Sequence, residues 1–127
     1  MTEYEVADLK ASNISALAAS QSNYASHTNI YLTLVFGFFA VAYVTGNNLT
    51  VFQVTVITVI YLAAACMQIY WMAVWIDTSI RLLRKIAELG ENIIPPKRGS
   101  IGRIVGLFLW FIGALAPLAF MWSIRHP

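Results

Sequence analysis

The polar side chains within the longest apolar stretch are the residues best placed to do chemistry there. Gln53, Tyr61 and Gln68 lie in a run without charge, and on a helix they fall within about a quarter turn of one another. An amide in lipid needs a hydrogen-bond partner, so we expect this face to point at protein. The sequence therefore predicts interhelical hydrogen bonding. The alternative is that symmetric copies line a narrow, uncharged pore with these groups.

Residue types that carry catalysis or hold a cofactor are sparse. A membrane haem would need two histidines at membrane depth, whereas His27 lies near the edge of an apolar run and His126 is next to the last residue. No apolar run holds the acidic or basic group of a proton relay, and no phosphate-binding loop, zinc spacing or nucleophile elbow occurs. The single cysteine, Cys66, is interpreted as a small buried packing residue. We expect no enzyme activity, no cofactor and no metal.

Composition and one long helical pattern place the chain in a membrane. Of its 127 residues, 59% are hydrophobic and 11% are charged, which leaves too little polar surface to close a soluble globule. The stretch 49–76 carries no charge, and a charged but helical pattern continues to Leu89. A helix over 49–89 would be roughly 60 Å long, about twice the hydrocarbon thickness of a bilayer. One end of this helix must therefore project from the membrane.

Two further apolar segments flank this stretch, so we predict a single all-α integral membrane domain with three transmembrane helices. Gly46 is followed by Asn47 and Asn48, which tolerate left-handed backbone angles and predict a tight turn between antiparallel spans. The predicted segments are an N-terminal segment over 1–27, spans over 28–45, 49–76 and 101–124, a helical extension of the second span over 77–90, and a loop over 91–100.

The N-terminal segment has a weak amphipathic pattern. Val6, Leu9, Leu17 and Tyr24 lie on one side of a helix, but the polar residues Asn13 and Ser20 interrupt this stripe. The segment is too polar for lipid and too poor in apolar residues for a core of its own. We predict a helix that lies on or just under the membrane and packs on protein; the alternative is a disordered tail.

The distribution of basic residues sets the expected orientation. The connection over 77–103 holds six cations against three acids, and the turn between the first two spans holds no charge. The positive-inside rule then places the N-terminus in the cytoplasm and the C-terminus outside an inner (plasma) membrane, with Arg125 on the minority side. We expect the six cations to face lipid headgroups, either as ordinary topology determinants or as specific ligands of anionic lipid. They are Arg81, Arg84, Lys85, Lys97, Arg98 and Arg103.

The extension of the second span carries an apolar stripe on a helix that is already in water. The stripe comprises Ile80, Leu83, Ile86 and Leu89. Three occupants would cover it: the chain's own N-terminal helix, the same helix of another copy, or a larger partner. Gly90 then ends the helix as a C-cap glycine.

The third span carries small residues on one face. Gly102, Gly106, Gly113 and Pro117 follow a four, seven and four spacing that permits close backbone approach. Packing within the chain and dimerisation explain the stripe equally well. Pro117 cannot bond the carbonyl group of Gly113, which predicts a kink.

Three functional classes agree with these features. The first is a non-catalytic structural or accessory membrane subunit in a homo-oligomer or a larger complex, with membrane lipids, itself or larger membrane subunits as partners and no nucleic acid. The second is a homo-oligomeric ion channel, and the third is a holin-like lytic pore, because small three-span proteins with one charged end occur there. We favour the first class because it needs only surfaces. Gly106→Leu or Gln68→Leu should then disrupt assembly.

Overall fold

The computed structural model contains helices and no strands over the residues that it describes, which are 1–90, 94 and 101–125. Helix α1 spans Glu3–Thr45, α2 spans Val51–Glu88 and α3 spans Ile101–Arg125, and a 3-10 turn over Gly46–Asn48 joins α1 to α2. All three helices are long and apolar enough to cross a membrane. The predicted all-helical class with three apolar helices is confirmed.

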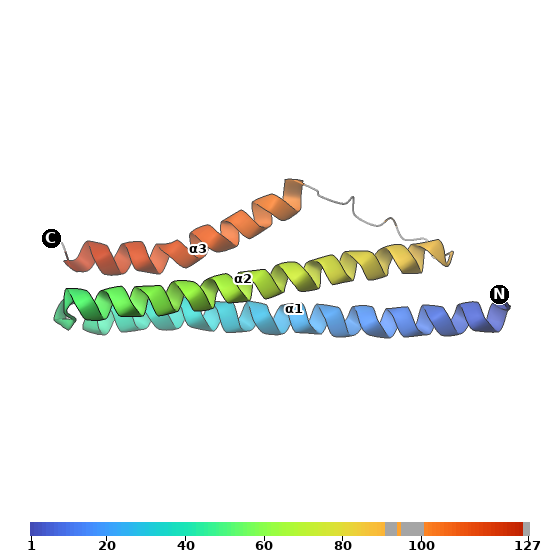
Figure 1. Cartoon of the computed structure of the whole chain (residues 1–127), viewed down its shortest axis with the longest axis horizontal. Coiled ribbons are helices and arrows are strands. Elements are labelled where there is room, and N and C mark those ends of the chain that lie inside the picture. Colours follow the sequence, from blue (N-terminus) through green and yellow to red (C-terminus); the bar gives the residue numbers. More distant parts are fainter. Residues whose placement is uncertain (91–93, 95–100, 126–127) are drawn as a thin grey trace.

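Helices α1 and α2 form a long antiparallel hairpin, and α3 lies along the part of it that contains the turn (Figure 1). The two hairpin helices continue well past the beginning of α3 (Figure 1). Helix α3 bends part-way along its length (Figure 1) and contains Pro117, which has no backbone N–H to donate. The molecule is therefore a three-helix unit at one end and a two-helix unit at the other.

Helix α1 has no break between the N-terminal segment 1–27 and the apolar segment that follows. It begins with a capping box, in which Thr2 Oγ1 accepts from the Glu5 backbone N–H at 3.3 Å and the Glu5 carboxylate accepts from the Thr2 backbone N–H at 2.8 Å. The helix continues for 43 residues, which is about 65 Å of helix axis. The N-terminal segment thus extends the first apolar helix along its own axis instead of forming a separate helix.

The connection between α1 and α2 differs from the sequence-based expectation. The predicted tight turn is present, but among the described residues no residue other than glycine has a positive φ, so Asn47 and Asn48 do not adopt the left-handed backbone. The turn is right-handed 3-10 backbone, and α2 begins at Val51, two residues later than predicted. Thr50 is the N-cap of α2, and its hydroxyl accepts from the Gln53 backbone N–H at 3.2 Å.

The end of α2 agrees with the prediction from Gly90. The last helical residue is Glu88, and Gly90 follows with φ +94°, a conformation that residues with a Cβ rarely adopt. Its N–H donates to the carbonyl oxygen of Ala87 at 3.1 Å. The helix therefore ends in a left-handed glycine cap.

The core lies where the three helices meet. Tyr31 of α1, Val54 and Met72 of α2, and Met121 of α3 are almost fully buried. Cys66, which we expected to be buried, is exposed on the outer surface of α2. The core is therefore a single narrow layer of side chains between the three helices. Each helix has a wide outer face that is exposed in the described part of the chain.

Candidate functional site

A regular seam of side chains joins α1 to α2 along the whole hairpin. On α1 its positions alternate between four-residue and three-residue steps, and over residues 3–27 every side chain that is not exposed belongs to this series. The α1 members are Val6, Lys10, Asn13, Leu17, Ser20, Tyr24, His27, Tyr31, Leu34 and Phe38.

The seam on α2 has the same alternation and is at least half-buried throughout. Its members are Val54, Thr58, Tyr61, Ala65, Gln68, Met72, Trp75, Ser79, Leu82, Ile86 and Leu89. A step that averages 3.5 residues keeps one stripe of a helix facing its partner over many turns, which is the pattern of a coiled coil. The hairpin is thus an antiparallel coiled coil that runs without interruption from the apolar segments into the N-terminal segment and the extension of α2.

Small polar residues allow the two helices to approach closely in the middle of the hairpin. Ser20 is 1% exposed, and its Oγ lies 2.7 Å from Ser79 Oγ and donates to the Trp75 carbonyl oxygen at 3.1 Å. Ser79 Oγ also donates to that carbonyl, at 2.9 Å. These bonds set the register, because they place Ser20 opposite the segment between Trp75 and Ser79.

About two turns toward the apolar end, His27 and Gln68 form the next polar contact of the seam. His27 Nδ1 lies 2.7 Å from Gln68 Oε1, so Nδ1 carries the hydrogen in this bond. The imidazole also stacks on Trp71, with ring centroids 6.0 Å apart and an angle of 12° between the ring planes. The predicted interhelical hydrogen bonding of Gln68 is therefore present within the chain, with His27 as its partner.

Two tyrosine hydroxyl groups fasten α3 to the hairpin. Tyr31 donates to the carbonyl oxygen of Trp110, and Tyr61 donates to the carbonyl oxygen of Ala114 at 2.8 Å. Tyr31 also meets Trp110 edge to face, with ring centroids 5.0 Å apart. Both acceptors are backbone carbonyl groups of α3 within the two turns before Pro117, so side chains of the hairpin bind the α3 backbone there.

Charged groups hold the two ends of α3. Near its first turn, Arg103 Nη2 donates to Asp77 Oδ2 of α2 at 2.8 Å. In its last turn, Arg125 Nη1 donates to the carbonyl oxygen of Gly46 at 3.2 Å and to that of Leu49. Arg125, the cation on the minority side by charge counting, thereby satisfies carbonyl groups of the α1–α2 turn.

The small-residue stripe predicted on α3 divides into a contact half and an open half. A Cβ built on Gly113 would lie 3.1 Å from the Tyr31 hydroxyl oxygen, whereas a Cβ on Gly102 or Gly106 would meet no described atom within 4 Å. Pro117 is buried. Only the Gly113 end of the stripe is therefore used for packing within the chain, and a role of Gly106 in contacts between chains stays a prediction.

The remaining predicted positions are placed as follows. Gln53 is exposed and does not face another helix. Because it lies in the first turn of α2, its Oε1 can accept from the Thr50 backbone N–H, at 2.9 Å. In the extension stripe Ile86 is 1% exposed, and Ile80, Leu83 and Leu89 are half-buried. Ile86 and Leu89 belong to the seam with α1, so the chain's own N-terminal helix covers that part of the stripe, whereas Ile80 and Leu83 lie outside the seam.

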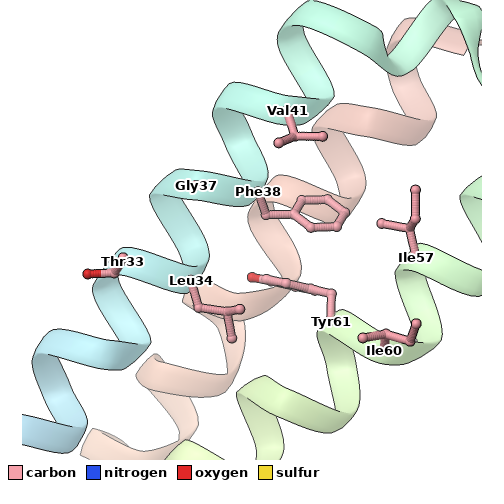
Figure 2. Close-up of a pocket in the computed structure, with 8 residues that line it drawn as sticks. All are labelled: Thr33, Leu34, Gly37, Phe38, Val41, Ile57, Ile60 and Tyr61. Carbon is pink, nitrogen blue, oxygen red and sulfur yellow. The ribbon is translucent and has the colours of Figure 1, made fainter.

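Two shallow apolar grooves lie on the outer surface of the three-helix part. One, between α1 and α2, has a volume of about 600 Å³ and includes Gly37, Phe38 and Tyr61 (Figure 2). In it the rings of Phe38 and Tyr61 pack with centroids 4.2 Å apart. The other, between α1 and α3, has a volume of about 470 Å³ and includes Gly106 and Trp110. Both are open and apolar, which is the surface that a lipid acyl chain contacts.

The described residues contain no cluster of three side chains of the types that ligate metals. Lys97, Arg98 and His126 lie outside the described residues. No family model, no curated protein and no solved structure matches this chain. The arrangement itself is thus the basis for function: a polar seam that joins two long helices, and polar bonds that hold a third helix to one half of them.

Most α1 members of the seam are absent from the sequence-based prediction. Hydrophobic periodicity selected Leu9, which is 44% exposed, and treated Asn13 and Ser20 as interruptions, although both belong to the seam. The signal that identifies the seam is the sustained four and three spacing itself, regardless of residue polarity. Polar members hide it from any search for apolar stripes alone.

Proposed function

We propose that this chain is a non-catalytic structural subunit of a membrane, which is anchored by three helices and presents a two-helix stalk to partner proteins on one side. We call residues 3–19 of α1 and 78–88 of α2 the stalk; they lie beyond the contacts of Ser20 and the Asp77–Arg103 ion pair. The stalk is about 25 Å long at the helical rise per residue. Its arrangement supports a role as a rigid projecting surface.

The observation that carries the proposal is the continuity of the coiled coil across the boundary where α3 begins. A hairpin whose only task was to span a bilayer would need about 20 residues per helix, whereas α1 has 43 and α2 has 38. The extra length carries exposed apolar side chains that are distributed around α1 in the stalk: Tyr4 is 84%, Leu9 44% and Ile14 51% exposed. Because single exposed apolar residues are normal on protein surfaces, the extra ordered length of the two helices is what carries the proposal.

Purification of the tagged chain from its native membranes in mild detergent tests this proposal. We expect further membrane or cytoplasmic chains to co-purify, and we expect Tyr4→Ser, Leu9→Gln and Ile14→Gln together to release them, because these side chains make the proposed contact. Phe36→Ser, an exposed position on the lipid-facing part of α1, is the control and should retain them. A chain that purifies alone as a monomer, or that turns over a substrate, contradicts the proposal.

The proposal includes an orientation with the stalk in the cytoplasm of a cell with an inner (plasma) membrane. Arg81, Arg84 and Lys85 lie on the stalk, while the turn at the other end of the hairpin has no charged residue of its own. With Cys66 replaced by alanine, Ser12→Cys should react with a membrane-impermeant maleimide only after the cells are opened, and Asn47→Cys should react in intact cells. The reverse labelling pattern would overturn the orientation and leave the fold unaffected.

The pore alternative depends on polar groups that the chain itself engages. Gln53 caps α2, Tyr61 bonds α3 and Gln68 bonds His27. A polar side chain with a partner in its own chain is less suited to line a water-filled path. No feature of the described residues favours the channel or the holin-like class over a structural subunit.

A further inference from the structure

The sign of the exposed charges on the stalk changes with distance from the three-helix part. At the far end Glu3, Glu5 and Asp8 are exposed. Near α3, Arg81 and Lys85 are exposed on α2, four and eight residues beyond Asp77. These spacings correspond to about 6 Å and 12 Å along the helix axis. The exposed acids of α1 thus lie at the tip of the stalk, and the exposed cations lie between its base and its middle.

Arg81 and Lys85 have no acidic residue opposite them on the neighbouring helix. Helix α1 contains no Asp or Glu from Leu9 to Thr45, and these residues include the whole segment opposite Arg81 and Lys85. The nearest acid toward α3 is Asp77, whose carboxylate already accepts from Arg103. Glu88, the next acid along α2, lies on the tip side of Lys85. The positive charges of Arg81 and Lys85 are thus exposed on the outer side of α2 and lie within about 6 Å of each other along the helix axis.

This level coincides with the expected membrane surface. Trp71 and Trp75 lie about two to four turns closer to the apolar part of α2, and indole rings prefer the headgroup region of a bilayer. Arg and Lys side chains extend along a helix and place their charge several ångströms from their own Cα atoms. Arg81 and Lys85 are consequently within reach of lipid phosphates.

We propose that Arg81 and Lys85 form a basic collar that binds the anionic headgroups of the leaflet on the stalk side. The inference rests on the proposed membrane insertion and adds a lipid class to it. The chemistry is that of a phosphate diester held by a guanidinium and an ammonium group. The acidic tip is repelled by the same lipids, so the charge distribution favours a stalk that stands away from the surface.

The test uses the full chain reconstituted in phosphatidylcholine vesicles that contain a trace of spin-labelled phosphatidylglycerol or spin-labelled phosphatidylcholine. Electron paramagnetic resonance separates lipid restricted by the protein from bulk lipid. We expect the wild type to restrict the anionic label preferentially, and Arg81→Gln with Lys85→Gln to reduce this preference by two- to fivefold for each charge at low ionic strength. Arg81→Lys with Lys85→Arg should retain it.

Glu3→Gln is the positional control, because it changes one charge at the tip of the stalk and should leave the preference unchanged. An equal loss for Glu3→Gln, or a preference that survives the collar variant, overturns the inference. Displacement by inorganic phosphate beyond that by chloride of equal ionic strength would also overturn it, since a free anion would then be the ligand. If the protein restricts lipid without preferring the anionic label, the collar is wrong but membrane insertion stands. If the protein restricts no lipid in any mixture, the proposed membrane insertion is wrong.

Discussion

Replacement of Gly113 by leucine is expected to detach α3 from α1 and to lower the free energy of unfolding by about 2–3 kcal/mol. The first added carbon would already lie 3.1 Å from the Tyr31 hydroxyl oxygen, and that hydroxyl donates to the Trp110 carbonyl group. The substitution therefore adds overpacking to the loss of an interhelical hydrogen bond, itself worth about 1 kcal/mol. Reversible unfolding in mixed micelles, followed by tryptophan fluorescence, measures the change.

Gly106→Leu is the matched control for this prediction. It places the same side chain on the same helix at a position where a Cβ meets nothing within 4 Å, so the monomer should keep its stability to within about 0.5 kcal/mol. If both variants are equally destabilised, the assigned α1–α3 contact is wrong. If Gly106→Leu leaves the monomer intact and dissolves an oligomer, the open half of the stripe is a contact between chains.

Ser20→Leu is expected to separate the two helices of the stalk. Ser20 is 1% exposed and its Oγ is 2.7 Å from Ser79 Oγ, so no room exists for the larger, branched side chain of leucine at this crossing. Overpacking costs typically about 1–3 kcal/mol. With Cys66 replaced by alanine and spin labels at Ser12→Cys and Glu88→Cys, the distance distribution across the stalk should lengthen and broaden.

Two substitutions distinguish steric from polar effects at this position. Ser20→Ala removes only the hydroxyl and should cost about 1 kcal/mol without altering the distance distribution. Ala19→Leu introduces the same bulky side chain one residue earlier, on an exposed face, and should change neither stability nor distance. A normal distribution for Ser20→Leu would contradict the register of the coiled coil.

The polar contacts of the site were only partly predictable. Gln68 was identified as a residue that needs a partner, because an amide in an apolar environment is costly when unpaired. Its partner, His27, is 41 residues away along the chain, and no local pattern indicates that separation. Arg125 was only a cation on the minority side until the fold brought it to the carbonyl groups of the α1–α2 turn, more than 70 residues away.

The sequence alone determined the features that depend on neighbouring residues. Apolar length predicted three helices that can cross a membrane, and Gly90 predicted the end of α2 because only glycine adopts its left-handed backbone at no steric cost. Only the tertiary structure decided the features that depend on register: Gly113 meets Tyr31 while Gly106 meets nothing, and Ser20 lies in the seam while Leu9 lies outside it. The physical reason is that register is set by how side-chain volumes and hydrogen bonds fit across two helices, and this fit becomes defined only when distant segments are side by side.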